Sequence, residues 1–156
     1  MISKQGCSMT QATSPLKIEL TVKIKASPAD IWEALTDSDE LENWWGEGVR
    51  LQAQKNGVFR EPWEDNKRTK QLATGSVKSF KVNEEIQFTW KEQDWPQKSV
   101  TVCTIKIIKD GAFCDVSVNH EGWDQFSKDQ SKQLMLDFKL GWNDHLQELK
   151  AYLEDS

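Results

Sequence analysis

Apolar and polar residues alternate in the first segment of the chain that carries a clear pattern. At residues 16–25 (LKIELTVKIK) every second residue is apolar, and most of the residues between are charged. This period of two predicts a strand with one face in the core. Ser27 and Pro28 then suit the N-cap and the first position of a helix. Asp37, followed by Glu40 three residues later, predicts a second short helix.

The middle of the chain predicts a series of antiparallel strands. Short extended segments at residues 49–52 and 58–63 lie on either side of Asn56-Gly57, a turn signal. Residues 70–82 follow as a longer strand, in which Gly75 indicates a bulge. Because each segment is short and is bounded by turn residues, a meander of hairpins is expected.

A hairpin is predicted between residues 70–82 and 86–91. A connection at residues 83–85 would place Phe80 opposite Phe88 and leave the polar residues on the other face. The period of two is self-consistent in this register.

Asp110-Gly111 predicts a second hairpin, because this dipeptide favours a two-residue loop. That loop would place Ile107 opposite Cys114 and Thr101 opposite His120. Six apolar residues then share the inner face: Cys103, Ile105, Ile107, Cys114, Val116 and Val118. The two cysteines are out of register by about 13 Å along the strand, so no disulfide is expected.

A long amphipathic helix closes the chain. Ser127 and Gln130 form a capping box. Apolar residues then recur at steps of three and four, as a buried helical face requires: Met135, Phe138, Trp142, Leu146, Leu149 and Leu153. Gly141 lies in the middle of this helix, where glycine is unfavourable. Two explanations are close packing on the sheet and space for a ligand, and close packing is favoured.

The order of these elements predicts an α+β fold. We expect a helix-grip architecture, in which a curved antiparallel sheet of six to seven strands wraps on the long C-terminal helix. Two short helices follow the first strand. Residues 1–15 are interpreted as a flexible leader, and residues 16–156 as one domain.

Composition narrows the function. The net charge is −5, with 20 Lys and Arg against 25 Asp and Glu. This argues against nucleic acid and against an anionic membrane surface as partners. No run approaches the ~20 apolar residues that span a bilayer. Three cysteines without CxxC spacing favour a reducing, cytoplasmic location.

Tryptophan is unusually frequent, with 8 among 156 residues. Large core filler is one interpretation, and an aromatic-lined cavity is the other. The candidate ligand-binding residues lie on the inward face of their strands or on the apolar stripe of the last helix: Trp63, Phe88, Trp90, His120, Met135, Phe138 and Trp142.

Catalytic chemistry has one low-ranking candidate. His120 could act as a general acid or base at the cavity mouth, or it could be a structural histidine satisfied by Thr101. Three acids could serve as pocket carboxylates, although abundant acids make chance proximity common: Glu61, Glu64 and Glu121. His145 is expected on the surface. No metal or phosphate motif occurs, so no metal or cofactor is expected.

The order of several motifs resembles a known family. S-P-A-D-I-W-E-A-L-T-D at residues 27–37 and L-E-N-W-W at residues 41–45 are similar to bacterial homologues of the activator of the heat-shock protein 90 ATPase. These proteins belong to the START-like, Bet v-like (SRPBCC, helix-grip) superfamily. Further matching motifs are Asn56-Gly57, Gly75-Ser76-Val77, Phe88-Thr89-Trp90, His120-Glu121-Gly122-Trp123 and Gly141-Trp142.

This resemblance covers residues 16–153 and implies a hydrophobic cavity between sheet and C-terminal helix. Many relatives carry Gly-Gly where this chain has Asn56-Gly57. The separate chaperone-binding domain of the eukaryotic co-chaperones is not found in these 156 residues. The family therefore supports the fold more directly than the co-chaperone role.

The expected function is non-catalytic binding of a small hydrophobic or aromatic molecule by a monomer or weak dimer. One alternative is a stress-response co-chaperone-like module that stimulates a heat-shock protein 90 type ATPase. The other is a cyclase- or hydratase-like enzyme that uses His120.

Overall fold

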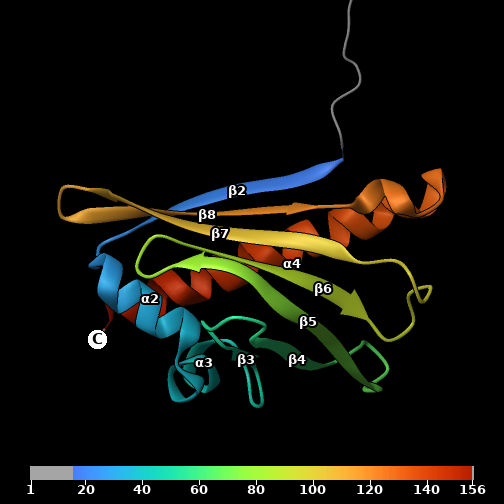
Figure 1. The fold of residues 1–156 in the computed structure, drawn as a ribbon, viewed down its shortest axis with the longest axis horizontal. Coiled ribbons are helices and arrows are strands. Elements are labelled where there is room, and N and C mark those ends of the chain that lie inside the picture. Colours follow the sequence, from blue (N-terminus) through green and yellow to red (C-terminus); the bar gives the residue numbers. More distant parts are fainter. Residues whose placement is uncertain (1–15, 156) are drawn as a thin grey trace, which may run out of the picture.

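The computed structural model describes residues 16–155 (Figure 1). The predicted leader at residues 1–15 lies outside the described residues. In chain order the elements are β2 (Lys17–Ile24), α2 (Pro28–Thr36), α3 (Ser38–Trp44), β3 (Arg50–Leu51), β4 (Val58–Glu64), β5 (Lys70–Lys81), β6 (Glu85–Glu92), β7 (Thr101–Asp110), β8 (Phe113–Glu121), the 3₁₀ turn η1 (Trp123–Gln125) and α4 (Lys128–Glu154). This is the predicted α+β helix-grip fold.

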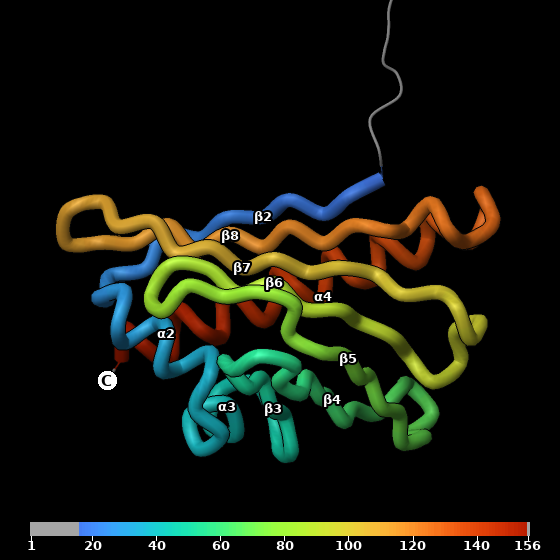
Figure 2. Tube along the Cα trace, in the orientation of Figure 1, coloured from blue at the N-terminus to red at the C-terminus, as the bar shows by residue number. Residues whose placement is uncertain are grey.

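The described strands form one antiparallel sheet of 7 strands in the order β2-β8-β7-β6-β5-β4-β3. Neighbours in the sheet are neighbours in the chain, except that the first strand pairs with the last. Figures 1 and 2 show α4 running behind the sheet, with α2 and α3 at one end. The core lies between the inner face of the sheet and these helices, as layer packing requires.

The helices begin where the capping residues predict. The Ser27 hydroxyl accepts a hydrogen bond from the backbone N–H of Asp30 at 3.1 Å. The Asp37 carboxylate accepts from Asp39 N at 2.9 Å and from Glu40 N at 3.2 Å. These side chains satisfy N–H groups that a helix start leaves without intrahelical partners. Asp37, which ends α2 and caps the start of α3, therefore separates the two helices.

The β7–β8 hairpin has the predicted faces and a different register. Ile107 lies opposite Val116 rather than Cys114, a slip of two residues. The loop is Gly111-Ala112, since Asp110 still pairs with Phe113. All six residues predicted to face inward are buried: Cys103, Ile105, Ile107, Cys114, Val116 and Val118. Both thiols are free, as predicted.

The β5–β6 hairpin also differs from its predicted register. Phe80 lies opposite Ile86 rather than Phe88. The irregularity falls between Val77 and Ser79, so the bulge predicted at Gly75 is wrong. Gly75 has another role, because an added Cβ would overlap the carbonyl oxygen of Thr89. The glycine permits a close approach of two backbones.

Strand β6 shows most clearly which residues of the sheet face the core. Every second residue from Ile86 is buried, and the others are partly exposed. The inner series begins with Ile86 and Phe88, continues with Trp90, and ends with Glu92. Period-two geometry therefore places a carboxylate on the core side of the sheet at the end of this strand.

Candidate functional site

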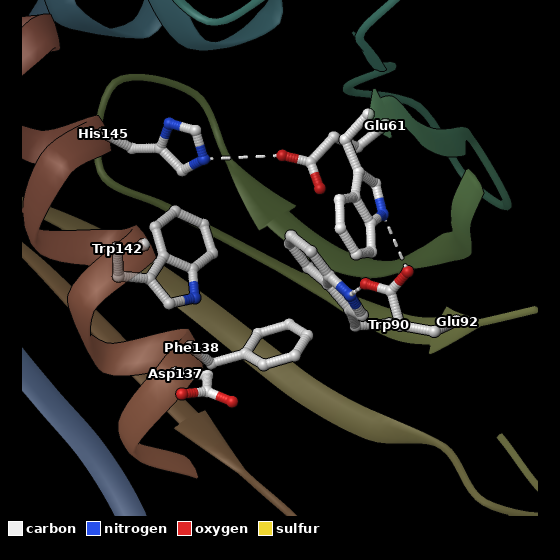
Figure 3. Close-up of a pocket in the computed structure, with 9 residues that line it drawn as sticks. Glu61, Trp90, Glu92, Asp137, Phe138, Trp142 and His145 are labelled. Carbon is white, nitrogen blue, oxygen red and sulfur yellow. Dashed lines mark hydrogen bonds and ion pairs between the residues drawn. The ribbon is translucent and has the colours of Figure 1, made fainter. Parts of the chain in front are cut away.

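A pocket of about 320 Å³ lies between α4 and strands β4 and β6 (Figure 3). Its walls are mainly aromatic, and its polar groups are three carboxylates and one imidazole. The lining residues are Glu61, Trp63, Trp90, Glu92, Asp137, Phe138, Gly141, Trp142 and His145. No lysine or arginine is among them. Pockets of this kind, apolar with a few convergent polar groups, are typical of small-molecule sites.

Helix α4 supplies one wall through its helical repeat. Phe138, Trp142 and His145 lie at steps of four and three, so they share one face. Gly141 lies beside them, and an added Cβ there would meet no atom within 4 Å. The close packing predicted for Gly141 is therefore wrong, because the missing side chain leaves space at the pocket.

Glu92 is the most constrained carboxylate of the pocket. One oxygen accepts the indole N–H of Trp63 at 2.9 Å, and the other accepts that of Trp90 at 2.8 Å. The residue is only 5% exposed. Burial raises the pKa of Glu92; the two indole donors oppose this effect, and the nearby charge of Glu61 adds to it.

Glu61 comes from β4 and faces His145 across the pocket (Figure 3). Its Oε2 accepts the indole N–H of Trp45 at 2.6 Å and lies 3.4 Å from Nε2 of His145. Within residues 16–155 no hydrogen-bond donor reaches its Oε1. A buried carboxylate with one oxygen unpaired retains capacity to bind a donor from a ligand.

His145 lies between two carboxylates rather than on the open surface. Its side chain is 24% exposed, which corrects the expectation of a surface residue. Nδ1 lies 3.4 Å from a Glu148 oxygen, but without the alignment of a hydrogen bond. The ring also lies against Trp45, with 4.8 Å between centroids.

His120 has both ring nitrogens occupied. Trp142 Nε1 donates to Nδ1 at 3.0 Å, so the ring proton is on Nε2. That nitrogen lies 2.7 Å from Thr101 Oγ1, and the hydroxyl in turn donates to Trp90 O at 3.3 Å. Burial lowers the pKa of His120 to about 3. The ring is therefore neutral and fully hydrogen-bonded.

The structure brings some of the seven predicted ligand-binding residues together at the pocket. Four line it: Trp63, Trp90, Phe138 and Trp142. Phe88 and His120 are fully buried and do not line the pocket, and Met135 is partly buried against the core. Thr101 was predicted to satisfy His120 as its cross-strand partner. The two side chains are in contact. The residue of β7 opposite His120 is Cys103, however, and not Thr101.

Of the three acids considered as pocket carboxylates, Glu61 lines the pocket, while Glu64 and Glu121 are exposed. Sequence reasoning missed three polar residues of the lining, namely Glu92, Asp137 and His145. The signal for Glu92 was its parity, since it lies two residues after Trp90 on the same face of β6. His145 lies three residues after Trp142, which places it on the same side of α4.

Other kinds of site find little support in the described chain. No group of three His, Cys, Asp or Glu residues between residues 16 and 155 could hold a metal ion. No helix in the same range is long and apolar enough to cross a membrane. Cys103 and Cys114 face the core, and burial raises the pKa of both thiols.

The architecture and its pocket define a START-like, helix-grip protein. Residues 25–154 match the family model described as Activator of Hsp90 ATPase homolog 1-like protein, and the chain belongs to this family. No curated protein matches the chain.

Solved structures share this fold at low sequence identity. Protein CV1439 from Chromobacterium violaceum is 22% identical with a TM-score of 0.72, over 88% of this chain and 96% of its own. The Aha1 dimer from Colwellia psychrerythraea is 21% identical with a TM-score of 0.69, over 89% of this chain and 96% of its own.

DynU16, a protein of the dynemicin biosynthetic locus, is 18% identical with a TM-score of 0.71, over 88% of this chain. The match covers 47% of DynU16, so the chain spans about half the length of that protein. Identities at this level establish a common fold alone.

Proposed function

We propose that this chain binds a small, mostly apolar or aromatic molecule in the pocket between α4 and the sheet. The observation that carries the proposal is the pocket itself, about 320 Å³ in volume and walled by Trp63, Trp90, Phe138 and Trp142. A few buried polar groups converge on the same space. Such a combination gives affinity through apolar burial and orientation through hydrogen bonds.

The state of His120 favours binding over the cyclase or hydratase alternative. A general acid or base must reach a substrate proton within hydrogen-bond distance. Both nitrogens of His120 are engaged by protein groups, and the residue is 0% exposed. The ring therefore supports the packing of α4 on β8 rather than proton transfer.

A thermal-shift screen with a blocked variant tests the proposal. The screen uses flavonoids, fatty acids, sterols, aromatic polyketides and aromatic amines. At about 100 times its dissociation constant, a ligand stabilises a fold by roughly 2.7 kcal/mol, which raises the midpoint by roughly 5–11 °C at this size. Tryptophan fluorescence should change with binding, because three indoles line the pocket.

Gly141→Leu should abolish the shift by filling the open space beside Trp142. Asn143→Leu is the matched control, since it adds the same side chain at an exposed position of the same helix. A shift that survives Gly141→Leu would place the ligand elsewhere. No shift with any class, together with a pocket filled by side chains in a crystal structure, would refute the proposal.

Family membership favours a second candidate, stimulation of a heat-shock protein 90 type ATPase. The test is the rate of ATP hydrolysis by the chaperone with and without an equimolar amount of this chain. An increase that also occurs with Gly141→Leu would assign the activity to a surface outside the pocket.

We also propose a cytoplasmic location for either function. Cys103 and Cys114 are buried free thiols, and free thiols are typical of proteins in a reducing compartment.

A further inference from the structure

Three acidic side chains line the pocket, and no lysine or arginine is among the lining residues. Glu61, Glu92 and Asp137 line it, against the single imidazole of His145. Arg60 and Lys91, the neighbours of Glu61 and Glu92 in the chain, form hydrogen bonds with backbone carbonyl groups instead. Arg60 donates to the carbonyl oxygen of Gly48 at 3.4 Å. Lys91 donates to that of Pro96 at 2.6 Å.

Neutral donors hold the two buried carboxylates. Glu92 accepts two indole N–H groups, and Glu61 accepts one from Trp45. Indole donors satisfy lone pairs but bring no positive charge. Burying carboxylates without a cation is costly. The only group of the pocket that can bring a positive charge is His145, which is shared with Glu148 outside the pocket.

The aromatic walls complement the same charge. The rings of Trp90 and Trp142 lie 5.7 Å apart at 63°, and Phe138 lies 5.6 Å from Trp90. These rings contact one another edge to face and also border the pocket. Indole attracts cations most strongly among the aromatic side chains. A cation in the pocket would therefore lie among aromatic rings as well as carboxylate oxygens.

We infer that the pocket selects hydrophobic organic cations, with an ammonium group at Glu61 and Glu92 and an apolar or aromatic body against the indoles of Trp63, Trp90 and Trp142. The inference rests on the proposed function and specifies its ligand class. The unpaired Oε1 of Glu61 is the acceptor left for the ammonium. Anionic ligands such as fatty acids would be repelled by the same carboxylates.

Three probes with one aromatic body test the charge preference. They are 2-(1-naphthyl)ethylamine, 2-(1-naphthyl)ethanol and 1-naphthylacetate, which are cationic, neutral and anionic at pH 7. Calorimetric titration of the full chain should give an amine affinity about tenfold above that of the alcohol, the size expected of one partly desolvated ion contact. The acid should bind more weakly than the alcohol.

Glu61→Gln should lower the amine affinity about tenfold and leave the alcohol within threefold, because glutamine keeps the acceptor for Trp45 and removes the charge. Glu33→Gln, an exposed site on α2, controls for net charge. Asp137→Asn, at an exposed position of the rim, gives a second variant and should cost the amine about two- to threefold.

Each outcome separates the charge inference from the proposed function. Equal affinities of amine and alcohol would overturn the inference and leave the proposed function standing. The same would follow if Glu61→Gln or Asp137→Asn weakened the two probes equally. Absence of binding by all three probes would count against both.

Discussion

The indole nitrogen of Trp142 donates a hydrogen bond to Nδ1 of His120 across 3.0 Å, and this contact joins the long helix to strand β8. Both residues are almost completely buried. Because Nδ1 accepts this bond, a second proton on the ring would remove the acceptor and add a charge in the core. The contact therefore depends on a neutral imidazole.

This dependence predicts a pH effect on stability. Burial lowers the pKa of His120 from its ordinary value of 6.5 to about 3. Between these two pH values the unfolded chain binds a proton at His120 that the folded protein does not. The free energy of unfolding should therefore be highest above pH 6.5 and should fall as the pH drops from 6.5 towards 3, at up to about 1.4 kcal/mol per pH unit. Urea unfolding at several pH values within that window measures the slope.

His120→Gln supplies the comparison for this slope. It removes the titration, and contributions from other groups cancel in the difference between the two proteins. The stability advantage of the wild type over His120→Gln should shrink as the pH falls below 6.5. A difference that stays constant between pH 7 and pH 4 would contradict the assignment.

Truncating Trp142 should separate its packing from its hydrogen bond. Trp142→Phe keeps an aromatic ring and leaves the buried Nδ1 of His120 without a donor, at a cost of about 1–3 kcal/mol. Trp142→Ala should cost more, roughly 3–5 kcal/mol, tending to the lower end because one side already borders a pocket. Leu140→Ala, at a residue 68% exposed, should stay within about 0.5 kcal/mol. Equal stabilities of Trp142→Ala and Leu140→Ala would refute this account.

Two glycines should respond in opposite directions to the same change. Gly75→Ala places a methyl group against the Thr89 carbonyl oxygen, so the paired strands must separate and stability should fall. Gly141→Ala adds a methyl group in open space within a helix, and should raise stability by about 1 kcal/mol. Denaturant unfolding of the two variants under one set of conditions measures both. A loss at Gly141 would mean that neighbouring atoms occupy the space beside it.

The sequence predicts which face each hairpin residue occupies better than which partner it meets. A slip of two residues leaves every side chain of β7 and β8 on its own face, so the apolar pattern cannot distinguish the registers. The choice depends on the loop: Gly111 has φ of 63° at the first loop position, where a type II′ loop places glycine. Lys23 also holds Asp110 at 2.7 Å, a contact from a strand far away in the chain.

The candidate site was accessible to sequence reasoning only in part. Trp63, Trp90, Phe138 and Trp142 follow from strand parity and helical period. The polar half of the pocket depends on pairings between elements, since Glu92 on β6 meets Trp63 on β4 across the intervening strand β5. His145 meets Glu61 from a different layer. Such contacts join residues far apart in the chain, and periodicity carries no information about them.

Glu92 provides the last prediction, because its pKa moves in the opposite sense to that of His120. Burial raises the pKa of Glu92 above its ordinary value of 4.5. The protonated form is thus favoured by folding, and that contribution is fully present below pH 4.5 and is lost as the pH rises through the raised pKa. Glu92→Gln resembles the protonated acid at every pH. Its stability relative to the wild type should therefore increase from pH 4 to pH 8, as measured by urea unfolding. Glu33→Gln should show no such trend, and a flat difference for Glu92→Gln would mean that Glu92 is ionised at no cost to the fold.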